Sequence, residues 1–122
     1  MKVYAFDVDE CLEISNGPVK LISMMELRDQ GHIIGIAGNW GLFCSRVESW
    51  QWLVSFLSVG LEKGEWLEHF KRYVIANEYI MVGNVFGEKN SLGFVCQSRD
   101  SEAAAKAGWR FIKEDDFANG VR

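Results

Sequence analysis

The stretch Lys2-Val3-Tyr4-Ala5-Phe6-Asp7-Val8-Asp9 decides the fold of this chain. It is a short, mostly apolar run that ends in two aspartates, Asp7 and Asp9. Uninterrupted apolar strands are typical of parallel sheets that helices cover on both faces. Ligands of such sheets gather at the carboxyl ends of the strands. The paired aspartates therefore predict a Mg²⁺ site, because one or two carboxylates and a substrate phosphate usually hold Mg²⁺.

Length and composition indicate one globular domain over residues 1–122. The 122 residues are enough for one core and too few for two. A hydrophobic share of 48% with 25% charged residues is typical of a folded chain. The net charge of −4 gives no signal for nucleic-acid binding. No membrane partner is expected either, since no stretch approaches the roughly 18 apolar residues of a span.

The cysteines predict a reduced, cytoplasmic protein. Their number is odd and no C-x-x-C pair occurs, so neither a disulfide framework nor a zinc site is indicated. Asp7 interrupts the apolar N-terminal run, which argues against a signal peptide. Free thiols are typical of cytoplasmic proteins. The cysteines are Cys11, Cys44 and Cys96.

The first half of the chain reads as strand, helix, strand, helix. Val3–Val8 is the first expected strand, and Pro18 opens a helix that ends near Gly31. Residues 32–38 form a second buried strand. A long helix is expected over residues 42–58, because apolar side chains recur there at spacings of three and four. Its wide aromatic face suits a second copy of the chain in a homodimer.

The second half continues the alternation. A helix over residues 65–74 precedes a third strand at Tyr79–Gly83. Residues 85–98 are expected to form an insert or hairpin around a turn at Gly87-Glu88-Lys89-Asn90. Asp100 is a good N-cap for a helix over residues 101–107. A fourth strand follows at 109–112, and a solvated polar tail begins at 114.

This order predicts an α/β fold with a mainly parallel sheet flanked by helices. If the first and third strands are neighbours, the side chains of Asp7, Asp9, Asn84 and Asp100 converge at one edge. A carboxylate at a strand end can attack phosphorus and form an aspartyl-phosphate. A second carboxylate can give a proton to the leaving group and later take one from water. A lysine would neutralise charge on the phosphoryl group.

These stretches resemble the haloacid dehalogenase-like (HAD) hydrolase superfamily. The resemblance rests on Phe6-Asp7-Val8-Asp9-Glu10-Cys11, on Ile36-Ala37-Gly38-Asn39, and on Met81-Val82-Gly83-Asn84 with residues 100–109. It implies a Rossmann-like fold that lacks a large cap domain. It also implies that Asp7 is the nucleophile, that Asp9 is the acid/base, and that the Mg²⁺ ligands are Asp7, the Asp9 carbonyl and either Asn84 or Asp100.

Two positions depart from the pattern of that superfamily. Ala37 or Gly38 stands where the family usually has Thr or Ser to bind phosphate, so Gly38 and Asn39 are the expected substitutes. Asn84 stands where the family usually has Asp. The phosphate-binding lysine is expected to be Lys63 by spacing, with Lys71 and then Lys89 as alternatives.

Two classes of function remain open at this point, and the sequence does not separate the first from a phosphotransferase or a nucleotide-handling enzyme on the same fold. The first is a Mg²⁺-dependent phosphatase that hydrolyses a small or macromolecular phosphomonoester. The second is a catalytically impaired binding protein of the same fold, associating as a dimer. Ala37 and Asn84 favour the second, because each removes a side chain that the chemistry normally uses.

Overall fold

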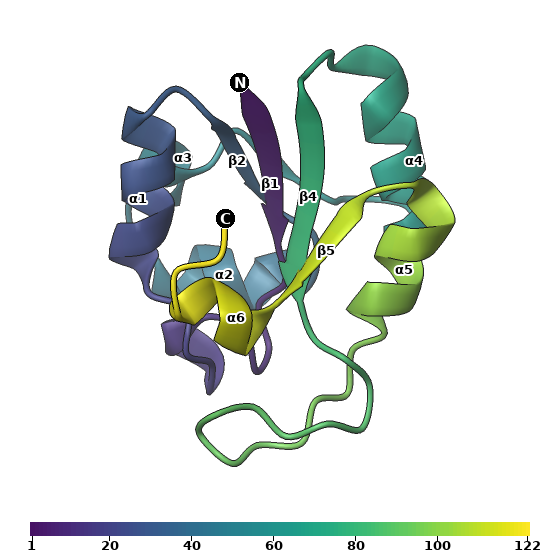
Figure 1. Ribbon diagram of the computed structural model, residues 1–122. Coiled ribbons are helices and arrows are strands. Elements are labelled where there is room, and N and C mark those ends of the chain that lie inside the picture. The colour runs from purple at the N-terminus through teal and green to yellow at the C-terminus, as the bar shows by residue number, and fades with distance from the viewer.

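The computed structural model describes residues 1–122 and contains a five-stranded sheet in which every pair of neighbouring strands is parallel. Helices cover both faces of the sheet (Figure 1). The α/β class with a parallel sheet, expected from the sequence, is therefore confirmed. The strands are β1 (Lys2–Phe6), β2 (Ile33–Ile36), β3 (Phe56–Leu57), β4 (Glu78–Gly83) and β5 (Arg110–Lys113).

The helices fall on two sides of the sheet. In Figure 1, α1 and α6 lie to the left of the sheet, and α4 and α5 lie to its right. No helix has the length and apolar character needed to cross a membrane. The helices are α1 (Leu21–Asp29), α2 (Trp40–Arg46), α3 (Trp50–Leu53), α4 (Lys63–Tyr73), α5 (Asp100–Ala107) and α6 (Glu114–Ala118), with a short 3₁₀ turn at Glu13–Ser15.

The strand order is β3-β2-β1-β4-β5, so the chain reverses its direction of winding between β1 and β4. Phe6 of β1 is in register with Ile36 of β2 on one side and with Val82 of β4 on the other. The carboxyl ends of β1 and β4 are therefore adjacent. In open α/β sheets, ligands bind in the crevice at this kind of topological switch point.

Alternation along β1 determines which side each later residue faces. Tyr4 and Phe6 lie in the core cluster that includes residues of α1, α2 and α6. Val3 and Ala5 lie in the other cluster, with residues of α4 and α5. Because successive side chains of a strand point to opposite faces, Asp7 continues the row that faces α4 and α5.

The prediction of one long helix over residues 42–58 is wrong. The structure has two short helices there, α2 and α3, followed by the edge strand β3. Val47 and Val54, at the ends of these helices, have extended backbones with φ values of −113° and −116°. Phe56 then pairs with Gly35 of β2, where a Cβ atom would lie 2.2 Å from the Phe56 ring. Pairing at the open sheet edge thus overrides the helical periodicity.

The C-terminal tail also differs from the expectation. Residues 114–118 form α6 rather than a solvated tail, because Phe117 is buried and packs edge-on against Phe6 with ring centroids 5.2 Å apart. Asp100 is the first residue of α5 and not its cap, a position that Arg99 takes. Gly108, in the left-handed conformation, ends α5 as the sequence predicts.

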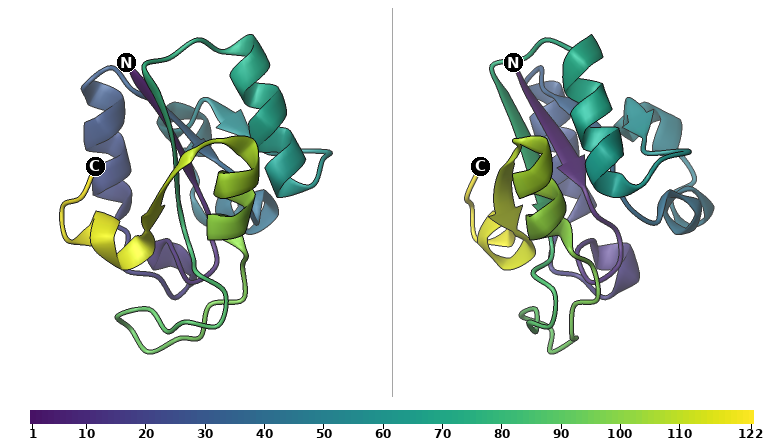
Figure 2. Two further views of the ribbon diagram at one scale, coloured as in Figure 1. Left: turned by 45° about the vertical axis from the view of Figure 1, so that its right-hand side comes forward. Right: turned by 90° about the vertical axis from the view of Figure 1, so that its right-hand side faces the viewer.

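Residues 84–99, here called the β4–α5 loop, project beyond the carboxyl edge of the sheet in every view (Figures 1 and 2). Lys89 and Val95 form an antiparallel bridge inside it, as a hairpin would. The ends of the loop are bonded to each other. The N–H of Asn84 donates to Asp100 Oδ2 at 2.8 Å, and the N–H of Ser101 donates to the Asn84 carbonyl at 3.3 Å.

Candidate functional site

Asp7, Lys63 and Asp100 form a charged cluster at the switch point. The Lys63 ammonium lies 3.1 Å from Asp7 Oδ1 and also donates to Asp100 Oδ1. Asp7 follows β1 directly, while Lys63 and Asp100 are the first residues of α4 and α5. Three segments that are distant in the sequence thus meet through one ammonium group. Lys63 is the lysine that spacing favoured.

Two glycines make room for this cluster. A Cβ atom on Gly38 would lie 2.3 Å from Asp7 Oδ1, and one on Gly83 would lie 2.4 Å from Asp100 Oδ2. Both contacts are closer than side chains tolerate, so each carboxylate lies directly against bare backbone. The glycine at the end of β4 and the glycine after β2 are therefore part of the geometry that holds the acids in place.

Burial governs the protonation of the cluster. Asp7 is 2% exposed and Asp100 is fully buried. Burial raises the pKa of Asp7 to about 8; the nearby charge of Asp100 adds to the rise, and Lys63 opposes it. Burial lowers the pKa of Lys63, but the two carboxylates outweigh it and leave this pKa above its usual value. The lysine therefore stays charged near neutral pH.

Asp9 lies in a separate and more open position. Its carboxylate accepts hydrogen bonds from the Ser15 hydroxyl at 2.8 Å and from the Asn39 amide at 3.2 Å. The Asn39 side chain also accepts the N–H of Leu42, so it caps the start of α2. Asn39 is thus bonded to Asp9 and to its own helix. Ser15, which sequence reasoning did not identify, fixes the other Asp9 oxygen.

Ala37 stands where the HAD pattern usually has Thr or Ser. Its side chain is fully buried in the apolar cluster that includes Val3 and Leu67. Ala37 follows β2 on the same face of the sheet as Asp7, and its methyl group offers no hydrogen-bond donor. The residue next to Asp7 is Gly38, which can offer only its backbone.

Asn84 connects the charged cluster to a second polar cluster that the sequence did not predict. Its side-chain amide donates to the Glu10 carbonyl at 3.1 Å, to Cys96 Sγ at 2.9 Å and to Glu114 Oε2 at 3.4 Å. No hydrogen bond joins this side chain to Asp7; the link to the charged cluster is the Asn84 backbone, which donates to Asp100. Asn84, Cys96 and Glu114 are all fully buried.

Glu114 forms no ion pair, although the charge of Lys113 acts on it. Burial raises the pKa of its carboxyl to about 7, and burial with the nearby Glu114 charge raises the pKa of the Cys96 thiol to about 11. The neighbouring Lys113 pairs instead with Glu88 and Asp115. No sequence signal identifies this cluster, because its members meet only through the path of the β4–α5 loop.

The alternative lysines lie elsewhere. Lys71 donates to the Gly108 carbonyl at 3.2 Å and lies over the ring of Tyr79. Lys89 is exposed in the β4–α5 loop and forms no ion pair. Neither contacts Asp7.

Two buried oxygens bear on the question of a metal ion. Asp7 Oδ2 and Asn84 Oδ1 are both enclosed and have no hydrogen-bond partner in the protein. Unpaired buried oxygens are costly, and a cation is one group that would satisfy them. No group of three His, Cys, Asp or Glu side chains converges in a way that could hold a metal. A Mg²⁺ site would therefore depend on an amide or main-chain oxygen beside the carboxylates.

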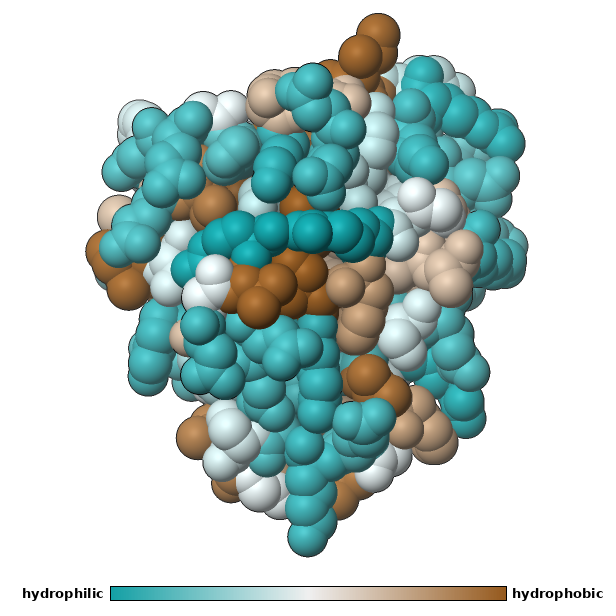
Figure 3. All heavy atoms as spheres, viewed as in Figure 1, coloured by the Kyte–Doolittle hydropathy of each residue, from teal (hydrophilic) through white to brown (hydrophobic).

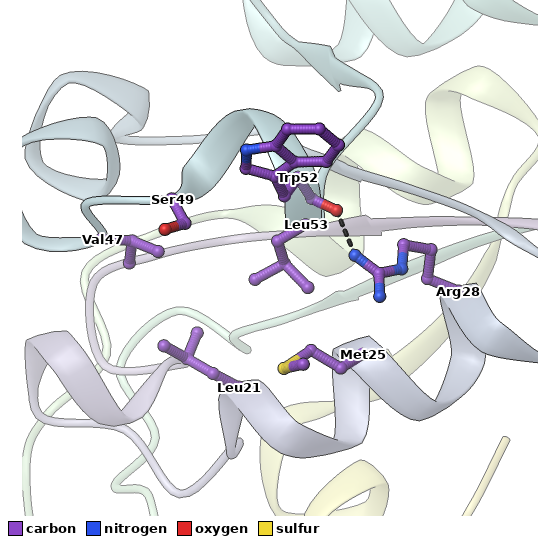
Figure 4. A pocket seen from close by; sticks show the side chains of 7 residues that line it. All are labelled: Leu21, Met25, Arg28, Val47, Ser49, Trp52 and Leu53. Atoms are coloured by element: carbon purple, nitrogen blue, oxygen red, sulfur yellow. Dashed lines mark hydrogen bonds between the residues drawn. The ribbon is translucent and has the colours of Figure 1, made fainter.

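The surface has two depressions. One, of about 330 Å³, adjoins the charged cluster and is lined by Glu62, Lys63, Ser98, Arg99, Asp100 and Ala103. The other, of about 150 Å³, lies between α1 and α3, where Trp52 stands over Leu21, Met25 and Leu53 (Figure 4). On the face seen in Figure 3, apolar atoms occur in small groups among polar ones. The polar depression is the one lined by members of the charged cluster, Lys63 and Asp100.

Comparison with protein-family models, with curated proteins and with solved structures finds no match to this chain.

Proposed function

We propose that this protein is a Mg²⁺-dependent phosphatase of the HAD type that hydrolyses phosphomonoesters through an aspartyl-phosphate on Asp7. The observation that carries the proposal is the contact of one partly buried ammonium, Lys63, with Asp7 and Asp100 at the switch point of a parallel sheet. A lysine held by two acids at a ligand-binding edge suits transfer of an anionic phosphoryl group. The free cysteines agree with a reducing, cytoplasmic setting.

The first half of the reaction forms the covalent intermediate. An oxygen of Asp7 bonds to phosphorus while the bond from phosphorus to the leaving-group oxygen breaks. The Asp9 carboxyl gives its proton to that departing oxygen. Hydrogen bonds from Ser15 and Asn39 keep the Asp9 side chain oriented for this transfer.

The second half releases phosphate. Asp9, now a carboxylate, takes a proton from water, and the water oxygen bonds to phosphorus as the bond to Asp7 breaks. Asp7 is only 2% exposed beneath Lys63, so the lysine must move aside when substrate enters. Its ammonium then pairs with phosphoryl oxygens in place of Asp7, and the backbone of Gly38 lies beside the same carboxylate.

The residues present fit a Mg²⁺ ion through oxygens alone. Asp7, the Asp9 carbonyl, Asn84 and Asp100 would hold it, and the unpartnered oxygens of Asp7 and Asn84 support this set. The bound ion would supply charge neutralisation for the phosphoryl oxygens. Because Asn84 is neutral, we expect weaker Mg²⁺ binding than an aspartate at this position would give.

The test is hydrolysis of 4-nitrophenyl phosphate by the full chain, with Mg²⁺ and with EDTA. We expect activity that requires Mg²⁺ and that falls by at least about a thousandfold in Asp7→Asn, since the amide cannot act as the nucleophile. Asp116→Asn is the matched control, because Asp116 is exposed on α6. Hydrolysis that survives Asp7→Asn, or that does not depend on the metal, would show the proposal to be wrong.

A second candidate is a non-catalytic binding protein of the same fold, associating as a dimer. The observation in its favour is Trp52, which is 80% exposed beside the apolar depression of about 150 Å³ (Figure 4). This candidate is preferred if no hydrolysis occurs and Mg²⁺ leaves the melting temperature unchanged. Sedimentation would then show that the wild type is a dimer and that Trp52→Glu is a monomer. A monomeric wild type would exclude a binding protein that acts as a dimer.

A further inference from the structure

The polar depression beside the charged cluster has the size and composition of a small-molecule site. Its volume of about 330 Å³ lies in the roughly 300–1,000 Å³ range of such sites. Only one of the residues that line it, Ala103, is hydrophobic. One wall is the first turn of α4, and the other is the end of the β4–α5 loop with the start of α5.

Two cations line this depression, and they differ in how many of their hydrogen-bond donors remain free. The Lys63 ammonium is already bonded to Asp7 and Asp100. The Arg99 guanidinium makes one side-chain hydrogen bond, from Nη1 to Glu102 at 3.3 Å. Because a guanidinium has five N–H donors, most of those on Arg99 remain free for a ligand.

The Arg99 guanidinium, which also pairs with Glu102, lies over an aromatic ring. Its guanidinium carbon lies 3.9 Å from the centroid of the Phe86 ring, and both residues belong to the β4–α5 loop. Stacking of this kind restricts the side chain without using its hydrogen-bond donors. A guanidinium held in this way matches a carboxylate or phosphate through two parallel hydrogen bonds.

The acidic lining residues do not cancel this preference. Asp100 is paired with Lys63. Both Glu62 oxygens accept backbone N–H groups, of Gly64 and Glu65, at the start of α4. Arg99 is therefore the lining residue best able to bind a further anion.

We propose that this depression binds the leaving group of the substrate, and that Arg99 selects phosphomonoesters whose leaving group carries a second anionic group, a carboxylate or a phosphate. This inference rests on the proposed function, because it takes the reacting phosphoryl group to lie at Asp7. Lys63 links the two places, because it lines the depression and contacts Asp7, so the organic part of an ester bound at Asp7 would extend past Lys63 toward Arg99.

Binding of two phosphonates that cannot be hydrolysed tests the inference. Phenylphosphonate and 4-carboxyphenylphosphonate differ only in the carboxylate, and calorimetry on the full chain with Mg²⁺ gives both affinities. We expect the carboxylated ligand to bind about tenfold more tightly, as one charge-assisted contact predicts. Arg99→Gln should remove this difference and leave the affinity for phenylphosphonate unchanged, while Arg99→Lys restores part of it.

Arg72→Gln is the matched control, because Arg72 is an exposed arginine of α4 that pairs with Glu68 and does not line the depression. It should change neither affinity. Equal affinities in the wild type, a preference that survives Arg99→Gln, or failure of both ligands to bind would each overturn the inference. The measurement needs no turnover, so a failed phosphatase assay and a failed Arg99 preference are separate results.

Discussion

At the scale of single residues, the charged cluster depends on the absence of side chains at two positions. Gly38 and Gly83 allow the carboxylates of Asp7 and Asp100 to lie where Cβ atoms would otherwise be. Neither glycine is needed for a left-handed turn, since a positive φ occurs at neither. Their role is close approach, and this makes them testable by the smallest substitution available.

Gly38→Ala should lower the free energy of unfolding by about 1–3 kcal/mol, because the new methyl group would lie 2.3 Å from Asp7 Oδ1. Gly41→Ala is the control: nothing lies within 4 Å of a Cβ atom there, and alanine favours α2. Urea unfolding of both variants measures the difference. If Gly38→Ala is as stable as the wild type, Asp7 is not packed against residue 38.

At the scale of secondary-structure elements, the β4–α5 loop is fastened to the connection that follows β1. The Asn90 side chain, 5% exposed, donates to the carbonyls of Glu10 and Asn16 at 3.1 and 2.8 Å. Glu10 has a φ of 55°, which is rare for a residue with a side chain. Its carbonyl accepts the amides of both Asn84 and Asn90, and these bonds hold the strained residue next to Asp9.

Asn90→Ala should lower the free energy of unfolding by about 1–3 kcal/mol, because it removes a hydrogen-bond donor from two partly buried carbonyls. It also removes the oxygen that accepts the N–H groups of Leu92 and Phe94. Hydrogen exchange should become faster at residues 10–16 as well as in the loop. Asn119→Ala, at an exposed asparagine after α6, is the control. Unchanged exchange at residues 10–16 would mean that Asn90 does not anchor that segment.

What could be predicted at this scale follows from how local each signal is. The first strand and its two aspartates can be predicted because the apolar run and the carboxylates lie in one short stretch of sequence. The prediction for residues 42–58 is wrong because an apolar run fits a helix and an edge strand equally well. Only pairing with β2 determines that residues 56 and 57 form a strand. The cluster of Asn84, Cys96 and Glu114 was not predictable, since no spacing reveals where a long loop returns to the sheet.

At the scale of the whole molecule, two buried carboxyl groups make folding sensitive to pH. The pKa of Asp7 is raised to about 8 and that of Glu114 to about 7, mainly by burial. A carboxyl group with a raised pKa in the folded state takes up a proton on folding. Its contribution is fully present below the unfolded pKa, near 4.5 for Glu114, and is lost as pH rises through about 7.

The metal-free protein should therefore become less stable between about pH 5 and pH 8. Glu114→Gln should reduce this loss by about 2–3 kcal/mol, because the amide has no proton to lose. Asp7 contributes to the slope that remains. Asp116→Asn, an exposed position on the same helix, should follow the wild-type profile. Chemical unfolding in EDTA across this range measures it, and a wild-type slope in Glu114→Gln would contradict the assignment.

The hydrogen bonds between the ends of the β4–α5 loop allow the length of this loop to change during evolution. The backbone of Asn84 forms hydrogen bonds with Asp100 and Ser101. The position of Asp100, which contacts Lys63, is therefore set by the two ends of the β4–α5 loop and not by the length of the loop. Lengthening a closed loop costs only about 0.6 kcal/mol for each doubling. Insertions and deletions can therefore change the length of this loop while the contact between Asp100 and Lys63 stays in place.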